Sequence, residues 1–172
     1  MAKQNIVIVG AGGAGLAVAS VLAAKIDSSR YTIVVISPRD RHFVMPALIR
    51  TVVTGEGKLE ESALIPLQQM LPNRNAKILI GKVVAVEDDG VAGSGGNVVL
   101  ENGEKVAYKF LVLATGTLFE GPLNFPASYA DIVSHVNEWR KKFAQAKSIA
   151  LVGGGTVGLG KSHTLVRVIY IL

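Results

Sequence analysis

The chain has 172 residues, of which 49% are hydrophobic and 18% are charged, and it contains no cysteine. This composition predicts a globular protein with a core, and it excludes disordered chains, disulfide frameworks and thiolate metal sites. The net charge of +5 is spread over scattered lysines and arginines rather than gathered in a basic run. Nucleic-acid binding is therefore not expected, whereas an anionic ligand suits the charge well.

No run of 18 or more apolar residues occurs, so we expect no transmembrane segment. The first predicted strand begins near residue 5, which leaves no room for a secretory or transit peptide, and the expected location is cytoplasmic. The sequence shows no metal-ligand cluster, catalytic triad or paired carboxylates, so it predicts no metal site and identifies no catalytic residue.

A glycine-rich turn separates a predicted strand from a predicted helix near the start of the chain. Residues 5–9 form a continuous β-branched run typical of a buried parallel strand, and the small apolar residues 16–24 favour a helix. Between them lies the GxGxxG pattern Gly10-Ala11-Gly12-Gly13-Ala14-Gly15. A strand-to-helix turn is the context that this pattern requires to bind a dinucleotide.

The three fingerprint glycines have different predicted roles. Gly10 allows the tight turn, Gly12 lets a pyrophosphate approach the backbone, and Gly15 lets the helix pack closely on the strand. The first N–H groups of the helix and the positive end of its dipole then face the phosphates. The alternative is a glycine-rich turn that binds no ligand.

Residues 31–36 form a second predicted strand and complete a βαβ unit. At its end, where this fold meets the adenosine ribose, stands Ser37, which is 37 − 15 = 22 positions after Gly15. A serine binds a hydroxyl more weakly than a carboxylate does, and Asp40 lies three residues too late. Alternatively, Ser37 and Pro38 only end the strand.

The next loop contains two residues of interest. Arg50 follows a proline-led helical turn over 46–50 and could reach a phosphate, although a solvated surface arginine is the simpler interpretation. His42 has no partner at ligand spacing, so we interpret it as a structural or packing residue.

The middle of the chain predicts mainly strands. Residues 64–67 and 70–71 indicate a short helix interrupted near Pro66, and residues 76–87 indicate one long strand. The apolar runs on either side of Asn102-Gly103 predict a hairpin and hence a three-stranded antiparallel excursion. Residues 110–116 predict a second buried strand closed by glycine.

After a linker over 121–126, Ser128 is placed to cap a helix. The predicted apolar face of this helix consists of Ile132, Val136, Trp139 and Phe143. We interpret Trp139 as a core residue rather than as a cofactor contact. Another predicted buried strand, 148–152, runs into a second GxGxxG pattern made by Gly153, Gly155 and Gly158. The β-branched tail over 166–171 favours a strand over a helix.

Two fingerprints, each after an apolar strand, resemble the N-terminal part of a flavoprotein with two dinucleotide-binding domains. The chain is most similar to apoptosis-inducing-factor-like NAD(P)H:quinone oxidoreductases, within the FAD/NAD(P)-binding pyridine nucleotide–disulfide oxidoreductase superfamily. The resemblance covers roughly residues 4–158. It rests on both fingerprints with their strands and on residues 37–39, 42–43, 46–50 and 111–116.

The resemblance implies an FAD-dependent oxidoreductase that passes hydride from NAD(P)H to FAD and then electrons to a quinone-like or other acceptor. The implied FAD-binding residues are Gly10, Gly12, Gly13, Ala14, Gly15, Ser37, Pro38, Arg39, Arg50, Lys82, Val83, Ala114, Thr115 and Gly116. Gly153, Gly155 and Gly158 would be a vestigial NAD(P) site. The absence of cysteine excludes the disulfide-reductase branch and favours a quinone or one-electron acceptor.

The implied fold class is α/β, with a Rossmann-like parallel sheet, the antiparallel excursion and the start of a second Rossmann-like domain. The expected divisions are an incomplete FAD-binding domain (1–120), a linker and helix (121–147) and the start of an NAD(P)-binding domain (148–172). After Gly158 the sequence departs from the family pattern, because no glutamate and no Gly-Asp motif follow.

This departure predicts a truncated chain with weak FAD affinity, no NAD(P)H oxidation by itself, and self-association through an open sheet edge. Two alternatives remain. One is a non-catalytic dinucleotide-binding module, in which Ser37, Arg39 and Arg41 suit the 2′-phosphate of NADP. The other is a non-functional fragment.

Overall fold

The computed structural model describes residues 2–71, 75–88, 90–91, 93–152 and 155, and the backbone of residues 168–171. The chain divides into two compact units, and each is described by itself. Unit 1 comprises Met1–His42 and Pro66–Thr117, and unit 2 comprises Phe43–Ile65 and Leu118–Leu172. Residues 43–65 thus pack with the later part of the chain, which the sequence did not indicate. The division into FAD-binding and NAD(P)-binding domains stays a prediction.

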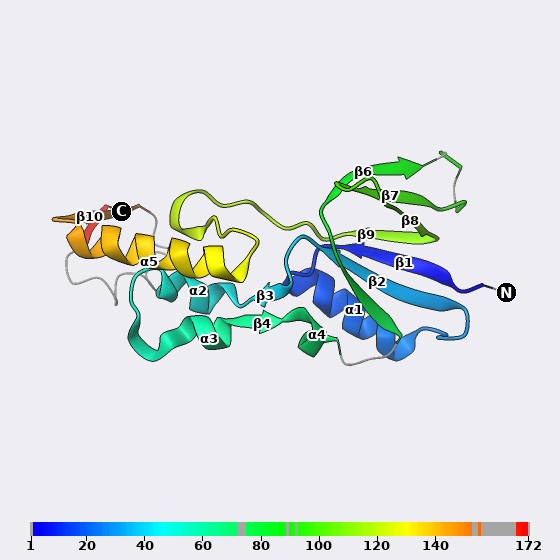
Figure 1. The fold of residues 1–172 in the computed structure, drawn as a ribbon, viewed down its shortest axis with the longest axis horizontal. Helices are drawn as coiled ribbons and strands as arrows, with labels where there is room; N and C mark the ends of the chain where they lie inside the picture. Colours follow the sequence, from blue (N-terminus) through cyan, green and yellow to red (C-terminus); the bar gives the residue numbers. More distant parts are fainter. Residues whose placement is uncertain are drawn as a thin grey trace. The chain divides into compact units, whose positions relative to one another are not determined.

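Unit 1 is built on a parallel sheet with the strand order β5-β2-β1-β9 (Figure 1). Its strands are β1 (Gln4–Val9), β2 (Tyr31–Ser37), β5 (Ala76–Ile80) and β9 (Phe110–Leu113). The helix α1 (Gly13–Lys25) connects β1 to β2, and its Leu16 and Ala19 pack against Ile8 and Ile33 in one core cluster. This confirms the βαβ unit that the fingerprint predicted.

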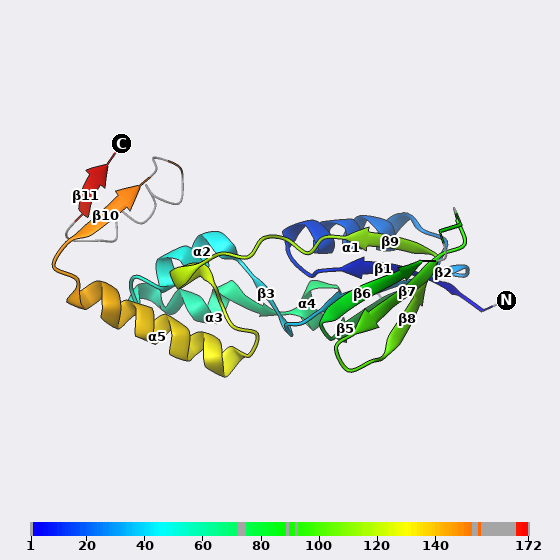
Figure 2. The same ribbon diagram turned by 90° about the horizontal axis from the view of Figure 1, so that it is seen from above.

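The other face of the parallel sheet is covered by the antiparallel sheet β6-β7-β8 (Figure 2). Its strands are β6 (Val83–Asp88), β7 (Gly96–Leu100) and β8 (Lys105–Tyr108). Val7 and Val34 point to this side and pack with Val98 and Leu100. Because side chains alternate along a strand, the continuous apolar runs of β1 and β2 serve two cores, as expected of strands buried on both faces. The predicted three-stranded excursion is confirmed.

Unit 2 is mainly helical and has its own core. It contains α2 (Met45–Thr51), the 3₁₀ turns η1 (Glu56–Lys58) and η2 (Gly121–Leu123), α3 (Leu59–Ala63) and α5 (Tyr129–Gln145). Ser128 Oγ accepts the Asp131 N–H at 3.1 Å, so the predicted N-cap is confirmed. The predicted apolar face of α5 is confirmed as well, because Ile132 and Val136 are buried and Trp139 packs against the same cluster.

Five short or late elements complete the described part of the chain. The strands β3 (Arg41–Phe43) and β4 (Leu64–Pro66) form a two-stranded sheet, and α4 (Leu67–Met70) follows in unit 1. The strand β10 (Ile149–Val152) pairs in parallel with β11 (Val168–Ile171). The predicted strand in the tail is therefore confirmed.

Two predicted elements are wrong. Residues 76–87 are not one strand, because the chain breaks at Gly81 and continues as β6 in a different sheet. The Gly81 N–H donates to the Ser37 carbonyl at 2.8 Å, which turns the chain at the end of β5. Residues 64–66 form β4 rather than a helix, and the helical turn begins only at Leu67. In both cases a tertiary contact overrides an apolar run that looked continuous.

Burial was over-predicted for two strands. In β9 the side chains of Phe110 and Leu113 are 51% and 63% exposed, and in β10 the side chain of Val152 is 84% exposed. Within its sheet β9 pairs only with β1 among the described residues. An apolar run predicts a strand, but the run carries no information about its place at a sheet edge.

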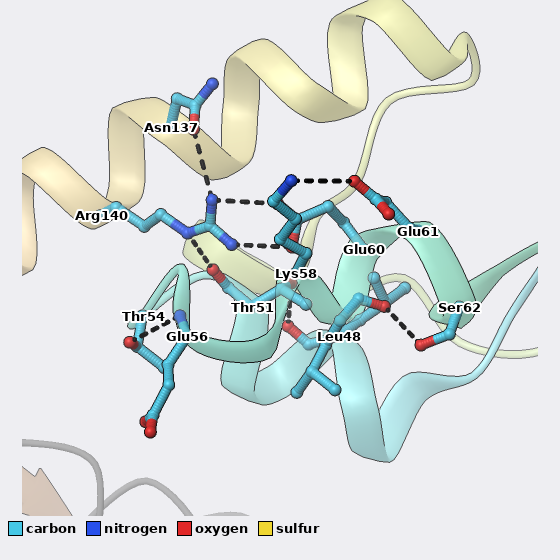
Figure 3. A network of polar contacts seen from close by, with 11 residues as sticks. Leu48, Thr51, Thr54, Glu56, Lys58, Glu60, Glu61, Ser62, Asn137 and Arg140 are labelled. Atoms are coloured by element: carbon cyan, nitrogen blue, oxygen red, sulfur yellow. Dashed lines mark hydrogen bonds and ion pairs between the residues drawn. The ribbon is translucent and has the colours of Figure 1, made fainter.

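A partly buried ion pair joins α3 to α5 in unit 2 (Figure 3). Arg140 donates to both carboxylate oxygens of Glu60, at 3.2 and 2.9 Å, and its Nε donates to the Thr51 carbonyl at 2.7 Å. Both charged side chains are 19% exposed. Burial acts to raise the pKa of Glu60, but the hydrogen bonds and charge of Arg140 outweigh it and hold that pKa below 4.5.

We expect Glu60→Gln to lower the free energy of unfolding by about 1–3 kcal/mol at pH 7. A carboxylate whose pKa is lower in the native than in the unfolded protein stabilises the native state at pH values above the unfolded-state pKa. This stabilisation is lost as the pH falls through the native-state pKa. The gap between wild type and variant should therefore shrink below about pH 4.5. Trp139, the only tryptophan, lies on α5 and reports the urea transition by fluorescence.

The control is Glu61→Gln, because Glu61 pairs with Lys58 at 3.9 Å through side chains that are 68% and 77% exposed. Such an exposed pair contributes about 0–1 kcal/mol. A gap for Glu60→Gln that is the same at pH 3.5 and pH 7 would contradict the assignment.

Candidate functional site

The carboxyl ends of the four parallel strands meet at one edge of the unit 1 sheet. In the register, Val9 pairs with both Ile36 and Leu113, and Ser37 pairs with Ile80. The residues that follow these strands, including Gly10 and Ala114, therefore lie along the same edge. In open α/β sheets this edge is where ligands bind.

The backbone of unit 1 itself requires glycine at two fingerprint positions. Gly10 has φ of +109°, and a Cβ there would lie 2.1 Å from the Ala114 carbonyl oxygen. A Cβ on Gly15 would lie 1.9 Å from the Gly10 carbonyl oxygen. Both distances are far inside van der Waals contact, so these glycines make the tight turn and the close approach of α1 possible.

Gly12 and Gly13, which lie between these two glycines, are not required by any close contact within the protein. A Cβ on Gly12 or Gly13 would meet no protein atom within 4 Å, and Gly12 has φ −76° and ψ −175°, which any residue can adopt. Gly12, Gly13 and Ala14 are exposed. The open space beside Gly12 is therefore on the outside of the turn, where a ligand can approach the backbone.

The same turn is the N-terminus of α1. Gly12 is the N-cap residue and has no side chain to accept a hydrogen bond, and the first turn of the helix contains no acidic residue. The positive end of a 13-residue helix is thus presented at an exposed, glycine-lined surface. This arrangement fits a pyrophosphate, which brings the acceptor oxygens and negative charge that the helix end lacks.

Ser37 and Arg39 lie at the end of β2. Ser37 is buried, and its Oγ accepts the Arg39 N–H at 3.1 Å, so the hydroxyl oxygen stabilises the turn while its O–H can still donate. Burial lowers the pKa of the Arg39 guanidinium, which nevertheless stays charged at neutral pH. Pro38, between them, is exposed. Both the strand-ending role and a hydrogen bond to a ribose are compatible with this geometry.

Lys82 and Val83 begin the antiparallel excursion. The Lys82 carbonyl accepts the Glu101 N–H at 2.8 Å, and its Nζ pairs with the Glu101 carboxylate at 2.8 Å. The Val83 side chain packs against the core between the two sheets of unit 1. Lys82 follows Gly81, which bonds to Ser37, so these residues do lie at the carboxyl edge.

The segment after β9 completes this edge. The Ala114 N–H donates to the Val9 carbonyl at 2.8 Å, and the Ala114 side chain packs against the core beneath α1. Thr115 and Gly116 are exposed, and Gly116 has φ of +74°. Of the proposed FAD-binding residues, the structure thus brings all but Arg50 together in unit 1.

Arg50 and the second fingerprint belong to unit 2. Arg50 pairs with Glu56 at 3.1 Å through exposed side chains, so its guanidinium already has a carboxylate partner. Gly155 is exposed, and a Cβ there would meet no atom within 4 Å. Gly153 and Gly158 lie outside the described residues.

One contact at the site was missed in the sequence. His42 Nδ1 lies 3.2 Å from the carbonyl oxygen of Ala11, the residue between Gly10 and Gly12. The two residues are 31 positions apart, and no local pattern indicates that they meet. The sequence identified His42 only as a structural or packing residue.

Comparisons with known proteins agree with this geometry. The family model described as pyridine nucleotide-disulphide oxidoreductase matches residues 4–168. An FAD-dependent oxidoreductase, FVFD30, from Flammulina velutipes is 43% identical over 108 residues, which are 63% of this chain and 33% of that protein. Apoptosis-inducing factor homolog A from Dictyostelium discoideum is 31% identical over 159 residues, which are 91% of this chain and 35% of that protein.

Among solved structures, the sulfide:quinone oxidoreductase from Aquifex aeolicus superposes with a TM-score of 0.63 at 25% identity. The match covers 87% of this chain and 34% of that one. The chain therefore spans about a third of the length of these proteins. None of the helices in the described residues is both long and apolar enough to cross a membrane.

The family match covers nearly the whole chain, and it includes the fingerprint, the parallel sheet and the residues at its carboxyl edge. The fold is the Rossmann-like FAD-binding architecture that the two fingerprints predicted. The chain belongs to the pyridine nucleotide-disulphide oxidoreductase family.

Proposed function

We propose that unit 1 binds FAD in an oxidoreductase that takes hydride from NAD(P)H and passes electrons to a quinone-like acceptor. The observation that carries the proposal is the open space at Gly12 and Gly13, at the uncapped N-terminus of α1. FAD supplies the redox chemistry when bound, by accepting a hydride on its isoalloxazine ring. The protein supplies binding, orientation and electrostatics.

Each part of the carboxyl edge has a role in this proposal. The N–H groups of the first turn of α1 donate to the pyrophosphate, and the helix dipole favours its negative charge. The Ser37 hydroxyl donates to the ribose of the adenosine, and the Lys82-Val83 backbone lies against the adenine. Ala114 and the exposed residues Thr115 and Gly116 border the flavin.

The NAD(P)H substrate and the electron acceptor are inferred from the second fingerprint, from the absence of cysteine and from similar proteins. Gly153, Gly155 and Gly158 follow β10 as the first fingerprint follows β1, which supports an NAD(P)H site at the second pattern. These 172 residues contain no cysteine, so they supply no dithiol to carry electrons from the flavin. FVFD30 is named as FAD-dependent, and the Aquifex protein as a sulfide:quinone oxidoreductase, which supports the cofactor and the class of acceptor.

A second candidate is a non-catalytic module that binds NADP at the same edge. The observation in its favour is that β2 ends in Ser37 rather than in an acidic residue, with Arg39 and Arg41 close behind. Arginine at this place suits a 2′-phosphate, whereas a carboxylate would repel it. The two candidates share the pyrophosphate site and differ in what lies beyond the ribose.

The test is the visible absorption spectrum of the purified chain after incubation with FAD and removal of free cofactor. Because the sequence predicts weak FAD affinity, we expect flavin bands that correspond to less than one FAD per chain after removal of free cofactor and that are released by denaturation. Titration with NADP, followed by displacement of FAD, separates the two candidates, because the module would bind NADP more tightly than FAD. A folded protein that retains neither cofactor at micromolar concentration would contradict both.

A further inference from the structure

We propose that His42 is a positioning residue of the dinucleotide site, which fixes the orientation of the peptide between Ala11 and Gly12. This inference rests on the proposed function, because it assigns the donor that the pyrophosphate would meet. His42 itself touches the turn and not the ligand.

The contact determines which ring nitrogen carries a proton. His42 Nδ1 lies 3.2 Å from the Ala11 carbonyl oxygen, which can only accept a hydrogen bond. The Nδ1 atom must therefore be the donor. Nδ1 carries hydrogen in one of the two neutral tautomers and in the imidazolium, and both forms can make this hydrogen bond.

The consequence follows from the geometry of the peptide unit. The peptide bond is planar and trans, so the Ala11 C=O and the Gly12 N–H point in opposite directions. When His42 holds the carbonyl oxygen, the Gly12 N–H is directed away from His42. That N–H belongs to Gly12, the N-cap residue of α1. A Cβ added to Gly12 would meet no protein atom within 4 Å, so the space beside this residue is open.

Without this hydrogen bond the peptide is easily reversed. Flipping the Ala11–Gly12 peptide changes mainly ψ of Ala11 and φ of Gly12, and glycine accepts positive φ at little cost. The flipped peptide would direct a carbonyl oxygen, in place of an N–H, to the phosphate side. The glycine that leaves room for the ligand thus also makes the turn ambiguous, and His42 removes the ambiguity.

His42 is in turn held by its neighbours in unit 1. The Asp40 carbonyl accepts the Leu67 N–H at 2.9 Å, and Leu67 is fully buried in the cluster that contains Ala11. The Arg39 N–H is bonded to Ser37 Oγ at 3.1 Å. The half-buried imidazole therefore extends from a fixed segment, as a positioning group requires.

The first test needs no cofactor. Long-range ¹H–¹⁵N NMR of the ligand-free chain distinguishes the two tautomers of each neutral histidine. We expect His42 to carry its proton on Nδ1 and His135 on Nε2, because His135 Nε2 lies 3.1 Å from the Pro122 carbonyl oxygen. His135 thus serves as an internal reference, and the variants His135→Gln and His163→Gln assign the signals of the three histidines. A neutral His42 with its proton on Nε2 would overturn the proposal.

The second test compares His42→Leu with His42→Asn. Leucine fills the space without a donor, whereas the asparagine amide can donate from a position close to that of Nδ1. We expect His42→Leu to weaken FAD binding about tenfold, the loss expected for one hydrogen-bonded positioning contact, and His42→Asn to recover most of that loss. The ¹H and ¹⁵N chemical shifts of the Gly12 amide, which belongs to the same peptide unit as the Ala11 carbonyl, should change in the leucine variant and return towards the wild-type values in the asparagine variant.

The outcomes separate the two proposals. A wild-type chain that binds no FAD contradicts the proposed function, and the tautomer and the chemical shifts of the Gly12 amide still decide the role of His42. A wild type that binds FAD and a leucine variant that binds it equally well overturn the positioning role. A merely structural role is indicated if melting temperature and FAD affinity fall together in both variants, and this outcome also overturns the proposal.

Discussion

Gly10→Ala is expected to destabilise unit 1 by roughly 3–5 kcal/mol, which is a large part of the stability of a small domain. Two effects combine at this position. The new Cβ would lie 2.1 Å from the Ala114 carbonyl oxygen, and alanine would have to adopt φ of +109°. Relief requires β1 and β9 to move apart, although the Ala114 N–H is bonded to Val9.

The measurement is the urea dependence of amide exchange in β1 and β2, since the only tryptophan lies in unit 2. The matched control is Gly13→Ala in the first turn of α1, where a Cβ meets no atom within 4 Å. Alanine favours a helix by up to about 1 kcal/mol over glycine, so this control should be neutral or stabilising. Equal loss of protection in both variants would show that the close approach at Gly10 is unimportant.

Gly12→Val is expected to leave unit 1 folded and to weaken FAD binding by about a hundredfold or more, because the side chain occupies the space that the pyrophosphate needs. The backbone at Gly12 has φ −76° and ψ −175°, which valine adopts without strain. Loss of glycine as the N-cap costs about 1 kcal/mol. The two effects therefore separate, with a large change in affinity and a small change in stability.

The control is Ala17→Val, which introduces the same side chain at an exposed position further along α1. Isothermal titration with FAD and urea denaturation are measured on both variants. Retained affinity in Gly12→Val, in a protein that binds FAD as wild type, would place the pyrophosphate elsewhere. Equal losses of affinity and of stability would mean that Gly12 serves the fold rather than the ligand.

The parts of the fold that were predictable are those specified by neighbouring residues. The β1–α1–β2 unit is encoded by an apolar run, a glycine turn and a small-residue helix, and the β7–β8 hairpin by Asn102-Gly103. In the structure Gly103 has φ of +84°, and the Asn102 side chain accepts the Glu104 N–H at 3.0 Å. Such turns are local chemistry, so the sequence shows them directly.

The parts that were mispredicted depend on contacts between distant segments. The run over 76–87 looks like one strand in the sequence, but in the structure the chain turns where the Gly81 N–H donates to the Ser37 carbonyl, and the run is divided between two sheets. The apolar run of β9 reads as buried, although Phe110 is 51% exposed. The apolar pattern of a sequence indicates which side chains can be buried. Whether they are buried depends on which strands and helices lie next to them.

For the site, the sequence by itself determined the fingerprint, its position between β1 and α1, and hence the class of ligand to be expected. It did so because a phosphate-binding turn needs particular residues within six consecutive positions. The sequence also predicted that Gly10 and Gly15 serve the turn and the helix packing, whereas Gly12 leaves room for a ligand. Only the tertiary structure showed that the Ala114 carbonyl is what lies against Gly10, and that the space beside Gly13 is open as well. The contact of His42 with Ala11 was likewise visible only in the tertiary structure, because the two residues are 31 positions apart in the sequence. Every residue has a backbone carbonyl, so the identity of residue 11 does not indicate that it accepts this hydrogen bond.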